Sequence, residues 1–333
     1  MPISPPLALA ALLLAVCLTA PAAAAPVDTV QMLSSDVRIV MHLDASQLMS
    51  RPWVNGVVER VARLPRLLDQ LNALETQYGI DPLRAVGDLT IAFPDRSRTG
   101  LPLWIVGGDI DAAKVLMGAK KAARLMTRKR AGHQYYTAPD GTGLAFVGER
   151  TLVGDRALLE RTLSAVGKKR GPRDPAFRRL LKQIDRHKAA WFVGSISSDV
   201  RRQLSRRAPI LGSLKAIRGV VDVTKGGRLD VWARLDPNDA QKIVARVQAD
   251  LAQMRGSAMV KIMGLDLLID RLVLRAEGEE LTLTLRLTEA EATRLQAALA
   301  MVASALIAGQ LSRPSVRSPP PGQRIRRARG KEK

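Results

Sequence analysis

The stretch Leu144–Val166 constrains the fold most, because it pairs two short apolar runs and then continues at once into an amphipathic segment. The runs Leu144–Val147 and Thr151–Gly154 flank a turn at Gly148–Arg150, which is typical of a tight β-hairpin. Asp155 stands where a helix N-cap is expected. The following apolar residues recur at helical spacing: Leu158, Leu159, Leu163 and Val166. This helix must bury one face, and the hairpin before it is the nearest surface.

A second hairpin and helix are predicted near the C-terminus. Arg271–Ala276 and Leu281–Leu287 form the two strands, and Thr288 with Glu291 forms a capping box that opens the last helix. Consecutive hairpins require antiparallel strand pairing. A largely antiparallel sheet is therefore expected.

An internal repeat connects the two halves of the chain. Leu103–Val115 and Val231–Ile243 align without gaps, and each passes from a strand through an acidic residue into an amphipathic helix. The aligned identities are Trp104 with Trp232, Asp111 with Asp239, Ala112 with Ala240 and Lys114 with Lys242. The sequence thus predicts an α+β fold of two related halves, each a mainly antiparallel sheet with amphipathic helices packed on one face.

Four segments are expected along the chain. Residues 1–24 form a signal peptide, residues 25–167 and 168–312 form the two α+β halves, and residues 313–333 form a disordered basic tail with little to bury. The boundary between the halves lies in the basic, Gly- and Pro-containing stretch Lys168–Pro175. In the last helix, the apolar run Ala297–Ala308 is too short to span a bilayer and indicates a buried helix.

The N-terminus predicts export. Met1–Ala24 has no charged side chain, has an apolar centre and ends in Ala22-Ala23-Ala24, which suits signal peptidase, although its first residues lack the usual Lys or Arg. A periplasmic or extracellular protein with no transmembrane span in the mature chain is expected. A membrane anchor and a lipoprotein attached through Cys17 are the alternatives, but Val16 stands where a small residue normally precedes a lipidated cysteine. Because Cys17 is the only cysteine, the mature chain would contain no disulfide.

The sequence contains no recognisable catalytic or cofactor motif. It has no Gly-x-Ser-x-Gly elbow, and His42, His133 and His187 show no metal-type spacing. Gly107-Gly108 follows a strand, but it lacks the further residues of a dinucleotide fingerprint or a P-loop. We therefore expect a protein that is not an enzyme, with no catalytic, cofactor-binding or metal site and no cofactor.

Positive charge is the one functional signal. The formal net charge is +21, of which the tail after residue 312 carries +7. Lys168–Lys188 holds nine Lys or Arg and two Asp, and its helical part should display a basic stripe opposite an apolar face. The candidate anion-binding residues are Arg178, Arg179, Lys182 and Arg186. Anionic lipid, glycan or acidic protein would suit such a stripe, whereas genomic DNA would not meet an exported protein.

Three functions follow in order of preference. The first is an exported, non-enzymatic envelope protein that binds or scaffolds through its basic surface. The second is a periplasmic lipid or lipoprotein carrier, which requires an apolar cavity lined by residues such as Leu67, Leu71, Leu159 and Leu163. The third is a hydrolase of unknown substrate.

The order of these motifs resembles a group of uncharacterised exported bacterial α+β proteins. The matching motifs are the turn Gly79-Ile80-Asp81-Pro82, the strand and helix start Trp104–Asp111, the turn Asp140-Gly141 and the strand Thr151–Asp155. The resemblance covers about residues 37 to 300. It implies the α+β fold and export, and it brings no catalytic residue and no activity.

Overall fold

The computed structural model describes residues 29–63, 65–95, 101–168, 171–207, 212–236, 239–262, 264–298 and residue 300. The predicted signal peptide and the predicted basic tail lie outside these residues.

The described residues of the first half of the chain contain seven strands. Its elements are α2 (Thr29–Met32), β1 (Val37–Asp44), α3 (Ala45–Met49), α4 (Pro52–Ala62), α5 (Pro65–Tyr78), α6 (Pro82–Ala85), β2 (Val86–Pro94), β3 (Leu103–Gly108), α7 (Ala112–Ala122), β4 (Met126–Arg130), β5 (His133–Thr137), β6 (Thr142–Val147), β7 (Arg150–Asp155) and α8 (Arg156–Ala165).

The second half, as far as it is described, contains five strands. Its elements are α9 (Pro175–Lys182), β8 (Ala190–Ser195), α10 (Ser198–Arg207), β9 (Ala216–Asp222), β10 (Gly227–Arg234), α11 (Asp239–Arg255), α12 (Ala258–Ile262), α13 (Asp266–Arg271), β11 (Leu272–Glu277) and β12 (Glu280–Leu287). A helical segment follows from residue 289.

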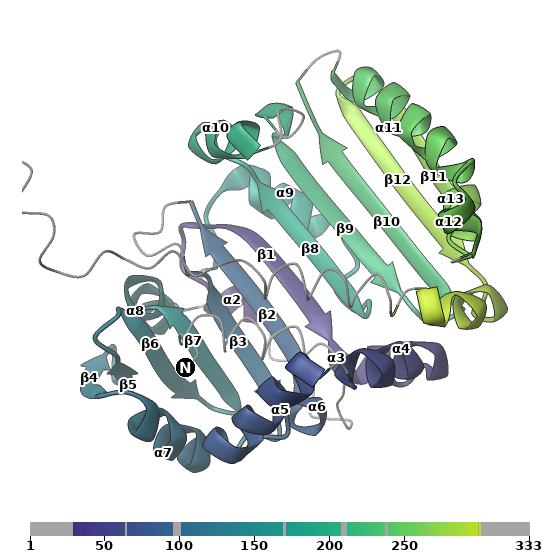
Figure 1. Ribbon diagram of the computed structural model, residues 1–333. Helices are drawn as coiled ribbons and strands as arrows, with labels where there is room; N and C mark the ends of the chain where they lie inside the picture. The colour runs from purple at the N-terminus through teal and green to yellow at the C-terminus, as the bar shows by residue number, and fades with distance from the viewer. Residues whose placement is uncertain are drawn as a thin grey trace, which may run out of the picture.

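All twelve strands form one antiparallel sheet (Figure 1). Its order is β11-β12-β10-β9-β8-β1-β2-β3-β7-β6-β5-β4. Outward from the central β1–β8 pair, the order β1-β2-β3-β7-β6 on one side matches β8-β9-β10-β12-β11 on the other. The α+β prediction is confirmed, and the related halves share a single continuous sheet.

The capping and turn chemistry read from the sequence is present. Asp155 accepts a hydrogen bond from the backbone N–H of Leu158 at 2.9 Å and so caps α8. At the last helix, the N–H of Thr288 donates to Glu291 Oε2 at 2.8 Å, and the N–H of Glu291 donates to Thr288 Oγ1 at 3.2 Å. These are the two reciprocal bonds of a capping box.

The ungapped repeat alignment is wrong by one residue. Trp104 lies on β3, the third strand from the centre of the sheet, and pairs with Ile91 and Val153. The row of paired residues that contains Trp104 continues across the sheet to Val231 on β10, the third strand on the other side of the centre. Trp232 is the next residue along β10 and therefore points to the opposite face. Trp104 and Trp232 therefore do not occupy equivalent positions.

The error arises at the two helix starts. Asp111 precedes α7 as its N-cap, with the N–H groups of Ala113 and Lys114 donating to its side chain, whereas Asp239 lies within the helix α11. Aligning the two aspartates therefore shifts the preceding strands by one residue. In a strand, such a shift moves every side chain to the other face.

Helices cover both faces of the sheet, contrary to the prediction of one. The adjacent β6 residues Leu144 and Ala145 are both buried, in separate clusters on opposite sides. Ala145 faces α8, and Leu144 faces α7. We call these sides the α8 face and the α7 face. When helices cover both faces of a sheet, the side chains on both faces of its strands are apolar. The alternation of apolar and polar residues then does not show how many faces are buried.

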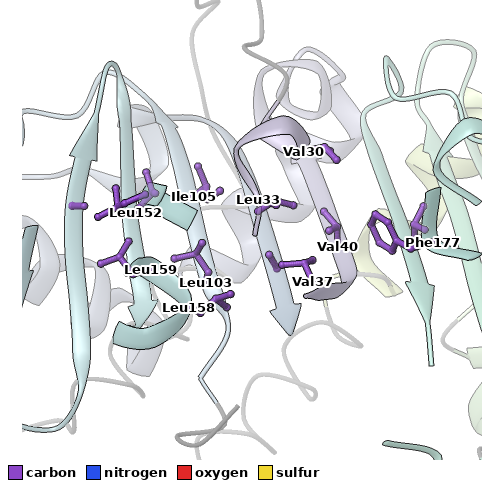
Figure 2. Packing of buried hydrophobic residues seen from close by; sticks show 14 of the residues in the cluster. Val30, Leu33, Val37, Val40, Leu103, Ile105, Leu152, Leu158, Leu159 and Phe177 are labelled. Carbon is purple, nitrogen blue, oxygen red and sulfur yellow. The ribbon is translucent and has the colours of Figure 1, made fainter. Parts of the chain in front are cut away.

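The main core lies on the α8 face, where α2, α8 and α9 pack on the strands (Figure 2). Leu158 and Leu159 of α8 lie against Leu103 and Leu152 in this cluster. Farther along the same face, Phe177 of α9 is fully buried. The α7 face is covered at one end by α7, which contacts α5, and at the other end by α11.

One further expectation needs correction. The periodicity of Val115, Ala119, Ala122 and Met126 predicts a single helix through Met126, but α7 ends at Ala122 and Met126 begins β4 with 46% of its surface exposed. The sequence Met126–Arg130 pairs with β5 as the edge strand of the sheet. Its basic side chains are compatible with a helix surface, but they are also typical of edge strands, where charge discourages pairing with another chain.

Candidate functional site

The predicted basic stripe lies on α9 and just beyond its end. Asp174 caps this helix and Pro175 is its first residue, as the sequence indicates. Phe177 and Leu180 are buried against the α8 face. The four candidate residues are exposed on the other side of the helix or beyond it: Arg178, Arg179, Lys182 and Arg186. Arg178 and Lys182 stand one helical turn apart, which gives about 6 Å of rise along the axis.

The start of α9 is held firmly in place. The Asp174 carboxylate accepts from the N–H groups of Ala176 and Phe177, each at 3.3 Å, and pairs with Arg38 of β1 at 2.5 Å. Burial alone would raise the pKa of Asp174, but the hydrogen bonds from Arg38 and Ser195 outweigh it and lower that pKa. The stripe is therefore fixed to the central strands rather than carried on a loose segment.

Three residues of the stripe have no ion-pair partner among the described residues. Within the residues that the structure describes, no carboxylate lies within ion-pair distance of Arg178, Arg179 or Lys182. Nearby Lys188 differs, because its ammonium contacts Asp222 at 2.7 Å. Two guanidinium groups and one ammonium group thus face solvent, and their positive charge favours binding to an anionic surface.

The other basic clusters offer less. Arg201 and Arg202 on α10 pair with Asp236 and Asp199, so part of their charge is compensated. In the cluster Lys120–Arg130, Lys120 lies over the ring of Tyr136, with its Nζ 5.9 Å from the centroid. The cluster Arg324–Lys333 lies outside the described residues.

The structure reveals a polar cluster that motif searching missed. His42 of β1 stacks on Trp191 of β8, with ring centroids 5.2 Å apart and an interplanar angle of 25°. Its Nδ1 is 2.9 Å from Thr90 Oγ1, which in turn lies 3.2 Å from Thr29 Oγ1 on α2. Burial lowers the pKa of His42. The carboxylates of Asp88 and Asp44 raise this pKa, but they offset only part of the effect of burial. The imidazole is thus kept neutral inside the sheet.

A buried ion pair lies beside this cluster. Arg150 of β7 reaches Asp88 of β2, although β3 lies between those strands. The two side chains are only 9% and 18% exposed. Neither residue forms a motif in the sequence, because their contact depends on strand order. The pair thus ties β2 to β7 across β3.

No group of three or more His, Cys, Asp or Glu side chains that could hold a metal ion is found in the described part of the chain. His42, His133 and His187 are distributed over β1, β5 and the loop after α9. In the same described part, no helix is long and apolar enough to cross a membrane.

The residues suggested for a carrier cavity do not surround one space. Leu159 and Leu163 are fully buried between α8 and the α8 face. Leu71 belongs to α5, which packs on α7 beyond the opposite face. The side chain of Leu67 lies outside the described residues.

Comparison with known proteins identifies no family. No family model matches the chain, and no curated protein matches it. Solved structures that resemble it include crystal forms I, III and IV of the bacterial protein TP0453, at 11–13% sequence identity and TM-scores of 0.43, 0.47 and 0.43. These matches cover 83–84% of this chain and 97–100% of the other. At such identity and similarity, the likeness does not bear on function.

Proposed function

We propose that the mature chain is an exported, non-enzymatic envelope protein that binds anionic surfaces through the stripe on α9. The observation that carries the proposal is the exposure of Arg178, Arg179 and Lys182, none of which has an ion-pair partner among the described residues, on the side of α9 opposite the buried Phe177 and Leu180. The apolar side fixes the helix to the sheet, and the basic side is left for a ligand. Anionic lipid, glycan and acidic protein share the negative charge that this arrangement selects.

The uncharged N-terminal segment supports export, which would bring the stripe to the cell envelope. Contacts at an exposed stripe are screened by salt, with a Debye length of about 8 Å at physiological ionic strength. Binding should therefore weaken steeply as salt rises and should show little selectivity among polyanions.

The test compares two triple variants of equal charge. The stripe variant carries Arg178→Ala, Arg179→Ala and Lys182→Ala, and the control carries Lys242→Ala, Arg246→Ala and Arg255→Ala on α11, where Lys242 and Arg255 already have acidic partners. Binding to phosphatidylglycerol vesicles and to heparin is measured at low and physiological salt. We expect at least tenfold weaker binding for the stripe variant and less than threefold for the control, with melting temperatures nearly unchanged. Equal losses would show a general effect of net charge and contradict the proposal.

A further inference from the structure

The two edge strands of the sheet carry different side chains. β4, at one edge, contains three consecutive basic residues, Arg128–Arg130. Charge of this kind discourages pairing with another strand. β11, at the other edge (Figure 1), has the sequence LVLRAE, which contains a single basic residue, and its Val273 is 45% exposed. The edge formed by β11 is therefore the one that a further strand can approach.

The hairpin of β11 and β12 fixes which backbone groups of β11 point outward. Its two-residue turn, Gly278-Glu279, has a φ of 59° at Gly278, and Glu277 pairs with Glu280 across it. In hairpins of this length the pair that closes the turn is hydrogen-bonded, and hydrogen-bonded pairs alternate with other pairs along the strands. The backbone groups of Leu274 and Ala276 therefore point away from β12, and no hydrogen bond joins them to another described residue.

A surface groove of about 430 Å³ lies between this open edge and α11. Its lining residues come from one flank of the helix and from the strand: Gln241, Val244, Ala245, Gln248, Leu274, Arg275, Ala276 and Glu277. The helix therefore presents no charged side chain to the groove, and three of its four lining residues are exposed: Gln241, Ala245 and Gln248. We call these three residues the neutral flank of α11. Both the strand edge and the helix flank are thus accessible beside β11.

Arg275 and Glu277 give this edge a self-complementary charge pattern. Both are exposed, and neither forms an ion pair with another described residue. They stand two positions apart and therefore lie on the same side of β11. When two antiparallel copies of β11 meet with Ala276 opposite the partner's Ala276, Arg275 lies opposite the partner's Glu277 and Glu277 lies opposite the partner's Arg275. Opposite charges in such cross-strand positions attract each other.

The neighbouring registers lack this match. Pairing centred on Arg275 would place two arginines opposite each other, which is repulsive. Pairing centred on Leu274 would place Glu277 opposite the partner's Arg271, which already has an acidic partner in its own chain. In the register centred on Ala276, Gly278 faces the partner's Leu274, and a Cβ atom at Gly278 would meet no described atom within 4 Å. The favoured register is therefore also sterically open at this position.

We propose that β11 is a homodimer interface, in which two copies of the chain join edge to edge about a two-fold axis at Ala276. The two Ala276 residues exchange backbone hydrogen bonds, and an ion pair between Arg275 and the partner's Glu277 forms on each side of the axis. The groove and the neutral flank of α11 face the partner. Such a contact is isologous, because each copy contributes the same surface. It is independent of the basic stripe, which lies on α9.

Charge reversal tests the ion pairs by analytical ultracentrifugation over a range of protein concentrations. Arg275→Glu and Glu277→Arg, each alone, place like charges opposite each other and should weaken the dimer at least about fivefold. An equimolar mixture of the two single variants should recover native association, because opposite charges then meet between unlike chains. The double variant should recover it as well. A native protein that stays monomeric, or a dimer that neither single change weakens, would overturn the proposal.

Cysteine crosslinking tests the register. In a Cys17→Ser background, Ala276→Cys places two thiols at the axis, where the Cα atoms of a hydrogen-bonded antiparallel pair are about 5.5 Å apart. Val273→Cys is the matched control on the same strand, because its two copies would lie about 20 Å apart along the strands. With a short bifunctional maleimide, we expect the dimer yield from Ala276→Cys to exceed that of the control severalfold. Equal yields would overturn the proposal, and so would a higher yield from Met126→Cys on β4, which would assign the contact to the other edge.

Discussion

The guanidinium group of Arg150 passes directly over Gly107 to reach the carboxylate of Asp88 two strands away. The three residues lie opposite one another on β7, β3 and β2. A Cβ atom at position 107 would lie 1.7 Å from Arg150 Nη1. The middle strand therefore needs glycine for its neighbours to pair, and Gly107 is explained by this contact rather than by phosphate binding.

Arg150→Met should destabilise the protein strongly, because it leaves Asp88 largely buried without its partner. Loss of one member of a buried pair costs about 3–5 kcal/mol, and the partial exposure of Asp88 places the expected loss in the free energy of unfolding near the lower end. Arg255→Met, which breaks an exposed pair with Asp270, should cost less than about 1 kcal/mol. Urea denaturation measures both. Similar losses in the two variants would contradict the assigned role.

The effect of Gly107→Ala on stability should be coupled to that of Arg150→Met. The added methyl group displaces the Arg150 guanidinium in the native protein but meets a shorter, uncharged side chain in Arg150→Met. A double-mutant cycle by urea denaturation should give a coupling of at least about 1 kcal/mol, as expected for residues in direct contact. Additive effects would show that Gly107 matters for another reason.

His42 should make stability depend on pH. Burial favours the neutral imidazole in the folded state, so the unfolded chain binds more protons once the pH falls below about 6.5. The free energy of unfolding should fall as pH decreases from there and level off below the lowered pKa of the folded state. Asp88, Asp44 and Arg150 are the charged groups acting on the ring, and burial outweighs the two carboxylates.

The matched variant is His42→Gln, which keeps a hydrogen-bonding group near Thr90. Urea denaturation between pH 5 and 8 should show a flatter profile for this variant than for the native protein. Carboxylates such as Asp222, whose pKa is lowered first by the hydrogen bond from Lys188, lose their contribution only below about pH 4, outside this window. Parallel profiles for the two proteins would refute the role of His42.

Gly219→Ala should disturb the sheet centre. A Cβ atom there would lie 2.4 Å from Cζ of the Phe192 ring and 2.9 Å from the carbonyl oxygen of Asp230. Overpacking of this kind costs about 1–3 kcal/mol. Gly227→Ala is the control, because its nearest atom, in Trp53, would be 3.6 Å away. A melting temperature lowered equally in both variants would show that the clash with Phe192 is not the cause.

The predicted signal peptide gives a simple mass criterion. Protein secreted from a bacterial host should begin at Ala25, and intact-mass analysis should show the loss of residues 1–24. Retention of Met1–Ala24 would contradict export by cleavage. A mass increase on a chain that begins at Cys17 would establish the lipoprotein alternative.

The sequence by itself determined the local elements of this protein. Asp155, Asp174 and the pair Thr288 and Glu291 act where their side chains reach backbone groups within three residues, so their capping roles follow from spacing alone. The hairpins follow in the same way from turns between short apolar runs. The exposed side of α9 was predictable too, because helical spacing separates Phe177 and Leu180 from the basic residues.

Tertiary structure decided everything that depends on which strands become neighbours. Arg150 and Asp88 are 62 positions apart, and only the placement of β3 between their strands, with glycine at the crossing point, brings them together. The stacking of His42 on Trp191 depends likewise on the central β1–β8 pair. Strand register resolved the repeat as well, since aligning Trp104 with Trp232 joins residues on opposite faces. Successive side chains of a strand point to opposite faces, so a shift of one residue moves every side chain to the other face. A sequence alignment can contain such a shift unnoticed, whereas the hydrogen-bonded register of the sheet excludes it.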